Sequence, residues 1–219
     1  MMTVRKGFLL AALVALVAVA TTTATGSASS KATCSNSNPL EFGVLNSVSG
    51  PAANIGKLNQ QGMDIAIADV NAAGGVLGRC LKRVLKDDGG DPTKAAQAVR
   101  ELVDQEGVKF VIGPFLSSPT NVVMPVLNQA KVLEINESAF PNAANASSFP
   151  YTFARETPST LIAQLFANFI KQRGWKRVGV IAANNALGQT LLPALNQVIP
   201  PAGATITKSE LVAPGTADM

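Results

Sequence analysis

Residues 109–135 read KFVIGPFLSSPTNVVMPVLNQAKVLEI and contain one complete strand–helix–strand repeat. The apolar segment 109–113 is typical of a buried strand, and the Ser- and Pro-containing stretch 114–120 is typical of a loop. A helix is expected over 121–130 and a second strand over 132–135. Two strands joined by a single helix form a βαβ unit, in which the strands are parallel.

The same alternation continues on both sides of this repeat. Further strands are expected at 41–45, 81–85, 151–154, 176–182 and 205–212, and further helices at 57–71, 91–106, 158–172 and 188–198. Right-handed crossovers place the helices on both faces of a parallel sheet. The sequence therefore predicts an α/β protein with parallel sheets flanked by helices.

The amino-acid composition excludes several classes of catalytic and metal-binding function. Of the 219 residues, 47% are hydrophobic, which is typical of a globular chain, and 15% are charged, which is a low share. The absence of histidine excludes Ser-His-Asp triads, Cys-His dyads and His-ligated metal sites. Neither a G-x-G-x-x-G motif nor a P-loop is present. We therefore expect no enzyme activity, no cofactor and no metal site.

Residues 1–28 are predicted to be a signal peptide, with cleavage after Ala20 or after Ala28 as the two alternatives. Arg5 and Lys6 precede an unbroken apolar run at 8–20, and small polar residues follow it. The run is shorter than the about 20 residues that a transmembrane helix needs. Without Arg5 and Lys6 the chain has 16 basic and 14 acidic residues, so we expect no nucleic-acid partner. The expected location is the periplasm or the cell surface.

Two cysteines, Cys34 and Cys80, follow this segment. An even number of cysteines in an exported chain indicates one disulfide, and two unpaired thiols are the alternative. Lipoprotein anchoring at Cys34 is a second alternative, but Lys31, three residues before it, fits a lipid-attachment signal poorly.

The loops after the expected strands share one chemistry. Residues 46–54, 114–120, 136–141 and 183–187 are rich in Ser, Asn, Gly and Pro and carry almost no charge. Ligands of open parallel sheets bind at the carboxyl ends of the strands. Hydroxyl, amide and backbone N–H groups there suit a small polar or anionic solute. Nearby, Asp87, Asp88 and Asp91 lack the spacing of a calcium loop and are expected to cap turns and a helix.

Several of these segments together carry a resemblance to a known family. The sequence resembles the type I periplasmic solute-binding proteins, specifically the branched-chain amino-acid (Leu/Ile/Val-binding) group that serves ABC importers. The resemblance rests on GVLNSVSGP at 43–51, GMDIAIADVNAAGGVLG at 62–78, VIGPFLSSPT at 111–120, GWKRVGV at 174–180 and APGTAD at 213–218.

The resemblance implies two Rossmann-like lobes with a ligand cleft between them. Residues 29–40 would be an N-terminal linker, 41–155 the first lobe and 156–219 the first part of the second. The expected partners are a membrane permease and a small ligand, either an amino acid or another small carboxylate or amide. A ligand-sensing receptor or regulator domain of the same fold is the alternative function.

The resemblance also assigns candidate ligand-binding residues. Ser117 falls on the family position that binds the ligand carboxylate, and Ser118 lies beside it. Ser138, with Ala139 next to it, falls where the backbone contacts the head group of an amino acid. Three further candidates depart from the family pattern: Ile55 and Leu187 replace aromatic rings, and Phe140 replaces a hydroxyl. We therefore expect a more aliphatic pocket, less suited to a zwitterion.

The chain is expected to be about half as long as members of this family. Both lobes should then be incomplete and should expose apolar edges that could pair with other chains. A fragment of a longer gene product and a non-functional relic are the two interpretations.

Overall fold

The computed structural model describes residues 33–138 and 148–213. The expected signal peptide and the candidate residues Ala139 and Phe140 lie outside the described residues. Within those two ranges, no helix is both long and apolar enough to cross a membrane.

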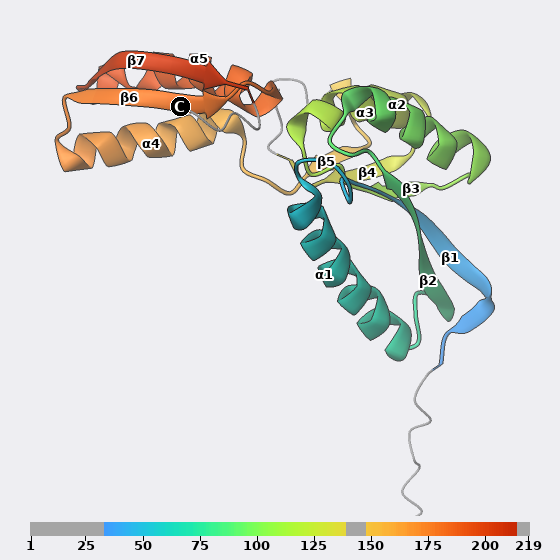
Figure 1. The fold of residues 1–219 in the computed structure, drawn as a ribbon. Coiled ribbons are helices and arrows are strands. Elements are labelled where there is room, and N and C mark those ends of the chain that lie inside the picture. Colours follow the sequence, from blue (N-terminus) through green and yellow to red (C-terminus); the bar gives the residue numbers. More distant parts are fainter. Residues whose placement is uncertain (1–32, 139–147, 214–219) are drawn as a thin grey trace, which may run out of the picture. The chain divides into compact units, whose positions relative to one another are not determined.

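The first sheet has five parallel strands in the order β2-β1-β3-β4-β5. Figure 1 shows α2 and α3 side by side on one face of this sheet and α1 on the other. The π-helical turn Glu101–Gln105 extends α2. The bounds are β1 Ser35–Asn46, α1 Ala53–Ala72, β2 Arg79–Asp87, α2 Pro92–Arg100, β3 Phe110–Ile112, α3 Ser117–Gln129, β4 Leu133–Asn136 and β5 Thr152–Ala154.

The main core lies between this sheet and the helices α2 and α3. Leu45 and Val111 from the sheet pack against Val99, Leu102 and other apolar side chains of the helical layer, including Ala95, Val123 and Leu127. These helices follow the expected 3.6-residue periodicity, so each turns one apolar stripe toward the strands.

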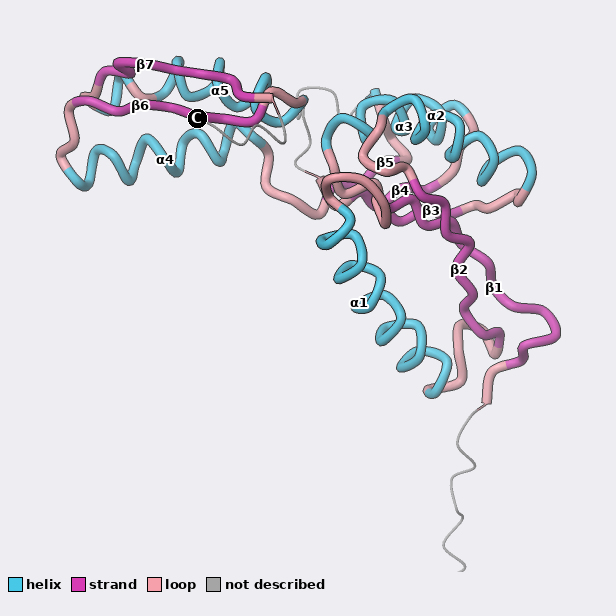
Figure 2. Tube along the Cα trace, in the orientation of Figure 1, coloured by secondary structure: helices cyan, strands magenta, loops and turns pink. Residues whose placement is uncertain are grey.

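The second sheet has two parallel strands among the described residues, β6 (Arg177–Ala183) and β7 (Thr205–Val212). Helices α4 (Ser159–Arg173) and α5 (Ala186–Val198) pack against each other, and the short turn Pro200–Ala202 follows α5 (Figure 2). Ala163 and Ile170 of α4 join Leu195 of α5 in a small core with Ile199 and Ala204. Leu161, Leu165 and Phe166 of α4 are at least half exposed, so apolar surface remains uncovered.

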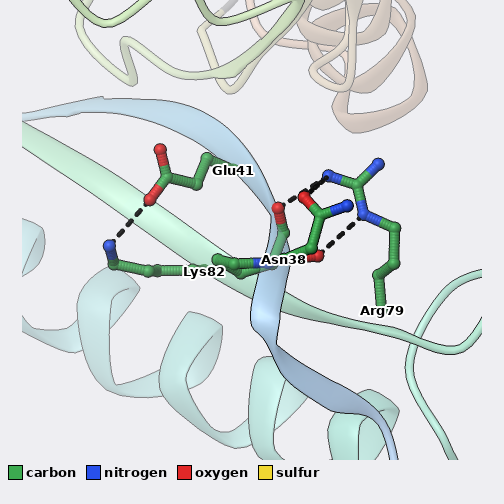
Figure 3. Close-up of polar contacts among 5 residues, drawn as sticks. Asn38, Glu41, Arg79 and Lys82 are labelled. Carbon is green, nitrogen blue, oxygen red and sulfur yellow. Dashed lines mark hydrogen bonds and ion pairs between the residues drawn. The ribbon is translucent and has the colours of Figure 1, made fainter.

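The predicted α/β fold class is confirmed, and the expected elements all form. The largest difference is at β1, which starts at Ser35, within the segment that we expected to be a linker. Arg79 explains this extension: its guanidinium donates to the carbonyl oxygens of Asn38 at 2.9 Å and of Pro39 at 2.7 Å (Figure 3). Lys82 also pairs with Glu41 at 2.7 Å across the two strands. These contacts hold an irregular, polar segment against β2.

The disulfide forms as predicted, between Cys34 and Cys80. The bridge joins the residue before β1 to the second residue of β2, where the Cα atoms lie 4.9 Å apart. It therefore fixes the residue before β1 to β2, the edge strand of the first sheet.

Helix α3 begins at Ser117, earlier than the sequence pattern predicts. We expected 114–120 to be loop, because Ser and Pro are common in turns. The same residues suit the first turn of a helix, where the missing N–H of Pro119 costs no hydrogen bond. Ser117 and Ser118 consequently stand at the N-terminus of a helix rather than in a loop before it.

Candidate functional site

A cavity of about 420 Å³ opens where several parallel strands end. Its wall combines four segments that are distant in sequence: the loop after β1, the loop after β2, the start of α3 and the loop after β6. The lining residues are Pro51, Ala52, Ile55, Gly89, Gly90, Pro92, Leu116, Ser117, Ser118, Pro119, Asn184 and Asn185. The cavity is therefore at the carboxyl ends of the strands, as expected for an open parallel sheet.

The start of α3 supplies hydrogen-bond donors to this cavity. Ser117 is buried and is the first residue of the helix. The backbone N–H groups of Ser117 and Ser118 make no hydrogen bond to any residue of the described chain, and neither does the Ser117 hydroxyl. The N-terminus of a helix also carries partial positive charge. These donors can bind an anionic group without a charged side chain.

The hydroxyl oxygen of Ser118 is already engaged. It accepts a hydrogen bond of 3.3 Å from the backbone N–H of Ala186, the first residue of α5. The side chain of Asn185 caps the same helix by accepting from the N–H of Gly188 at 3.0 Å. Asn184 and Asn185, just before α5, thus add polar groups to the lining, and Ala186 contacts Ser118.

Asp88 holds the loop between β2 and α2, which forms another wall. Its buried carboxylate accepts from the hydroxyl of Ser47 and, at 2.8 Å, from the N–H of Gly90. Burial raises the pKa of Asp88 above its usual range, although the hydrogen bonds from Ser47 and Gly90 oppose that shift. The carboxylate therefore joins the loops after β1 and β2.

Asp87 and Asp91 also accept hydrogen bonds from backbone N–H groups. Asp87 Oδ1 accepts from the N–H groups of Val48 at 2.9 Å and Gly89 at 3.0 Å. Burial acts to raise the pKa of Asp87, but hydrogen bonds, led by that from Ser49, hold it below the usual value. Asp91 caps α2 by accepting from Thr93 at 2.7 Å and Lys94 at 3.0 Å. The prediction that these residues cap backbone groups is confirmed.

The structure places only part of the predicted ligand-binding set on the cavity. Ser117, Ser118 and Ile55 line it, and the Ile55 side chain is 55% exposed. Ser138 is buried elsewhere, where its hydroxyl donates to Thr120 Oγ1 at 2.9 Å. Leu187 is half-buried in the first turn of α5 and is not part of the lining.

Sequence reasoning missed the wall formed by Gly89, Gly90 and Pro92. A signal for it was present, because a Gly-Gly turn directly follows an expected strand and so lies at the same edge of the sheet. Gly90 has a φ of +79°, and a Cβ atom there would lie 3.1 Å from Leu116. Glycine at this position lets the loop approach the start of α3.

The chemistry of the lining is that of a binding site. Its described residues offer hydroxyl, amide and N–H groups beside apolar side chains, and none of these residues is charged. A serine nucleophile would require a neighbouring general base, and no described residue of the lining can act as one.

A family model described as "Periplasmic binding protein" matches residues 39–219. The chain belongs to this family. Because the family consists of binding proteins, the expectation that the chain is not an enzyme agrees with its membership.

Proteins similar to this chain include Leu/Ile/Val-binding proteins. The chain is 28% identical over 180 residues to Leu/Ile/Val-binding protein homolog 3 of Brucella melitensis, covering 82% of this chain and 49% of that protein. It is 37% identical over 100 residues to the Leu/Ile/Val-binding protein of Escherichia coli K12, covering 46% of this chain and 27% of that protein. The chain thus spans about half the length of the Brucella melitensis relative, and the match to the Escherichia coli relative covers about a quarter of that protein.

Solved structures share the fold. The branched-chain amino acid transporter substrate-binding protein LivJ of Streptococcus pneumoniae, in complex with isoleucine, matches with a TM-score of 0.75 and 22% identity. The match covers 83% of this chain and 51% of that one. A solute-binding protein of an ABC transporter from R. palustris, in complex with 4-hydroxybenzoate, matches with a TM-score of 0.73, 22% identity and coverage of 83% and 49%.

Proposed function

We propose that the chain belongs to an extracytoplasmic solute-binding protein of an ABC importer. The protein captures a small amino acid or a related small organic solute in the cleft between its two lobes. The family membership and the names of the relatives support this function. We retain 41–155 and 156–219 as the proposed extents of the first lobe and of the first part of the second.

One observation carries this proposal: unsatisfied hydrogen-bond donors at the start of α3 and uncharged side chains line the same cavity. The N–H groups of Ser117 and Ser118 and the Ser117 hydroxyl can bind a carboxylate, while Ile55 and Leu116 can cover an apolar body. Among the described residues that line the cavity, none has an acidic side chain to pair with an ammonium group. Small carboxylates with an alkyl or aryl body therefore suit the described lining best.

The remaining candidates keep secondary roles in this proposal. Ser138 is proposed to stabilise the first turn of α3. Its hydroxyl donates to Thr120 Oγ1, and the Thr120 hydroxyl donates to the carbonyl oxygen of Leu116 at 2.9 Å. Leu187 is proposed to contact ligand only after the surrounding segments rearrange. Ala139 and Phe140 stay candidates on the resemblance alone.

The proposed location is the periplasm or the cell surface, reached through the signal peptide at residues 1–28. The proposed partner is the permease of the importer, which receives the ligand from the loaded binding protein. Co-purification with a permease would separate this function from a sensory role of the same fold.

Calorimetric titration of the purified protein tests the ligand site. We expect isoleucine or benzoate to bind without being converted, and the S117A variant to bind about fivefold more weakly, since a lost hydrogen bond costs roughly 1 kcal/mol. S209A is the matched control, because Ser209 is exposed on β7. Equal affinities of wild type and S117A would exclude the proposed site. Binding of none of the tested carboxylates, amino acids or amides would exclude the proposed function.

A further inference from the structure

Glu134 is a fully buried acidic residue on the strand next to the edge strand β5 of the first sheet, with a relative exposure of 0%. It lies on β4 and pairs with Val111 of β3 on one side and with Thr152 of β5 on the other. The alternating burial of β4 turns Glu134 and Asn136 to the same interior side. Neither the ligand site nor the main apolar core uses this carboxyl group.

Among the described residues, no charged partner compensates this burial. The elements packed around Glu134, namely β3, β5 and α3, contain no Asp, Glu, Lys or Arg. Lys109 and Lys131 precede β3 and β4, Arg155 follows β5, and all three are exposed. Burial accordingly raises the pKa of Glu134 to about 8, and the hydrogen bond from Thr152 opposes the shift only in part.

A chain of hydrogen bonds connects this carboxyl group to β5 and α3. The Thr152 hydroxyl donates to Glu134 Oε2 at 2.7 Å and accepts from Asn128 Nδ2 at 2.6 Å. The backbone N–H of Tyr151 donates to Asn128 Oδ1 at 3.0 Å, and that of Glu134 donates to the Tyr151 carbonyl oxygen at 2.8 Å. The start of β5 is therefore held at several points around one carboxyl group.

The network leaves one carboxyl oxygen unsatisfied. Glu134 Oε1 is buried and has no hydrogen-bond partner in the described structure. A neutral carboxyl tolerates this position far better than an ionised one, because an unpaired buried charge loses its hydration without compensation.

The strand held in this way is structurally weak. β5 has three residues, pairs along one edge only, and exposes 57% of Phe153. It is also the last strand before the chain leaves the first sheet for α4. We propose that Glu134 is a proton-dependent latch, whose neutral carboxyl holds β5 on the sheet and whose ionisation loosens the start of the crossing between the lobes.

The direction of the pH dependence follows from proton binding. The folded state keeps the proton up to about pH 8, whereas an unfolded glutamate loses it near 4.5. The attachment of β5 is then complete below pH 4.5, weakens as pH rises from 4.5 to about 8, and changes little above that.

Hydrogen exchange of the backbone amides at 149–155 tests the latch, after correction for the intrinsic rate at each pH. Between about pH 5.5 and about pH 9, we expect protection in the wild type to fall at least about tenfold, and protection in E134Q to stay constant. E156Q is the control, because Glu156 is exposed beside the same crossing and pairs with Arg155 instead. It should keep the wild-type profile. Equal pH profiles for wild type and E134Q would overturn the proposal.

A second measurement does not depend on how E134Q folds. The infrared spectrum of the wild type at pH 7 should contain the C=O stretch of a protonated buried carboxyl, which should be absent at pH 10.

Variants of Thr152 provide a further test. The T152V variant should lower the hydrogen-exchange protection of 149–155 at every pH, and T152S should restore the wild-type protection. Absence of the protonated band at pH 7, or full protection in T152V, would also overturn the proposal.

Discussion

The side-chain amide of Asn46 donates a 2.7 Å hydrogen bond to the carbonyl oxygen of Gly56, so the end of β1 is fastened to the first turn of α1. Gly56 is the only buried residue of that helix. A Cβ atom at position 56 would overlap with the carbonyl oxygen of Ser47. The contact requires glycine because two backbone segments meet there.

The G56A variant should therefore be less stable than the wild type. Overpacking of this kind typically costs about 1–3 kcal/mol, and denaturant unfolding would measure the loss. G62A is the matched control: Gly62 lies in the same helix, and a Cβ atom there has no atom within 4 Å. G62A should be neutral or gain up to about 1 kcal/mol, because alanine favours helix. Equal effects of the two substitutions would show that the contact with Ser47 is unimportant.

Loss of the disulfide should destabilise the first lobe. The bond joins residues 46 positions apart, and closing a loop of that size stabilises the folded state by about 4 kcal/mol in the loop-entropy model. We expect the unfolding midpoint in urea to fall on reduction, and C34S/C80A to match the reduced wild type without responding to reductant. A double variant as stable as the oxidised protein would contradict this expectation.

Helix α2 should respond to acid through Asp91. The hydrogen bonds from Lys94 and then Thr93 lower the pKa of Asp91 below 3.8. This contribution to stability is therefore complete above 3.8 and is lost as pH falls through the lower folded pKa. D91N should keep the cap, because asparagine also accepts at this position, and should lose less stability than the wild type on acidification. D91A should be less stable at every pH. Unfolding followed by circular dichroism between about pH 2 and about pH 6 distinguishes the three proteins.

The sequence alone was sufficient for the order and type of the elements. The mainly apolar segments 109–113 and 132–135 could be identified as strands because the residue pattern is a local property. The Asp91-Pro92 start of α2 and the Cys34–Cys80 pairing were also predicted and are confirmed. The boundaries were less accurate, as the polar segment before Glu41 shows: its pairing with β2 depends on Arg79, which is distant in sequence.

The candidate site was predictable only in part. The resemblance placed Ser117 and Ser118 at a ligand position, and both line the cavity. Ser138 was assigned to the same site through its backbone, and its side chain is buried, with the hydroxyl donating to Thr120 of α3. A residue following a strand can point into the cavity or into the interior, and the pattern of residue types does not distinguish these directions.

What the sequence by itself determined is therefore the α/β class, the resemblance to the family and the candidate serines Ser117 and Ser118. The tertiary structure decided which loops form one wall, because the order β2-β1-β3-β4-β5 differs from the chain order and brings Gly89 and Gly90 beside Ser117. It also decided that Glu134, one polar residue in an apolar strand, is wholly buried. Strand order and burial depend on contacts between distant segments, whereas residue patterns report only on near neighbours in the chain.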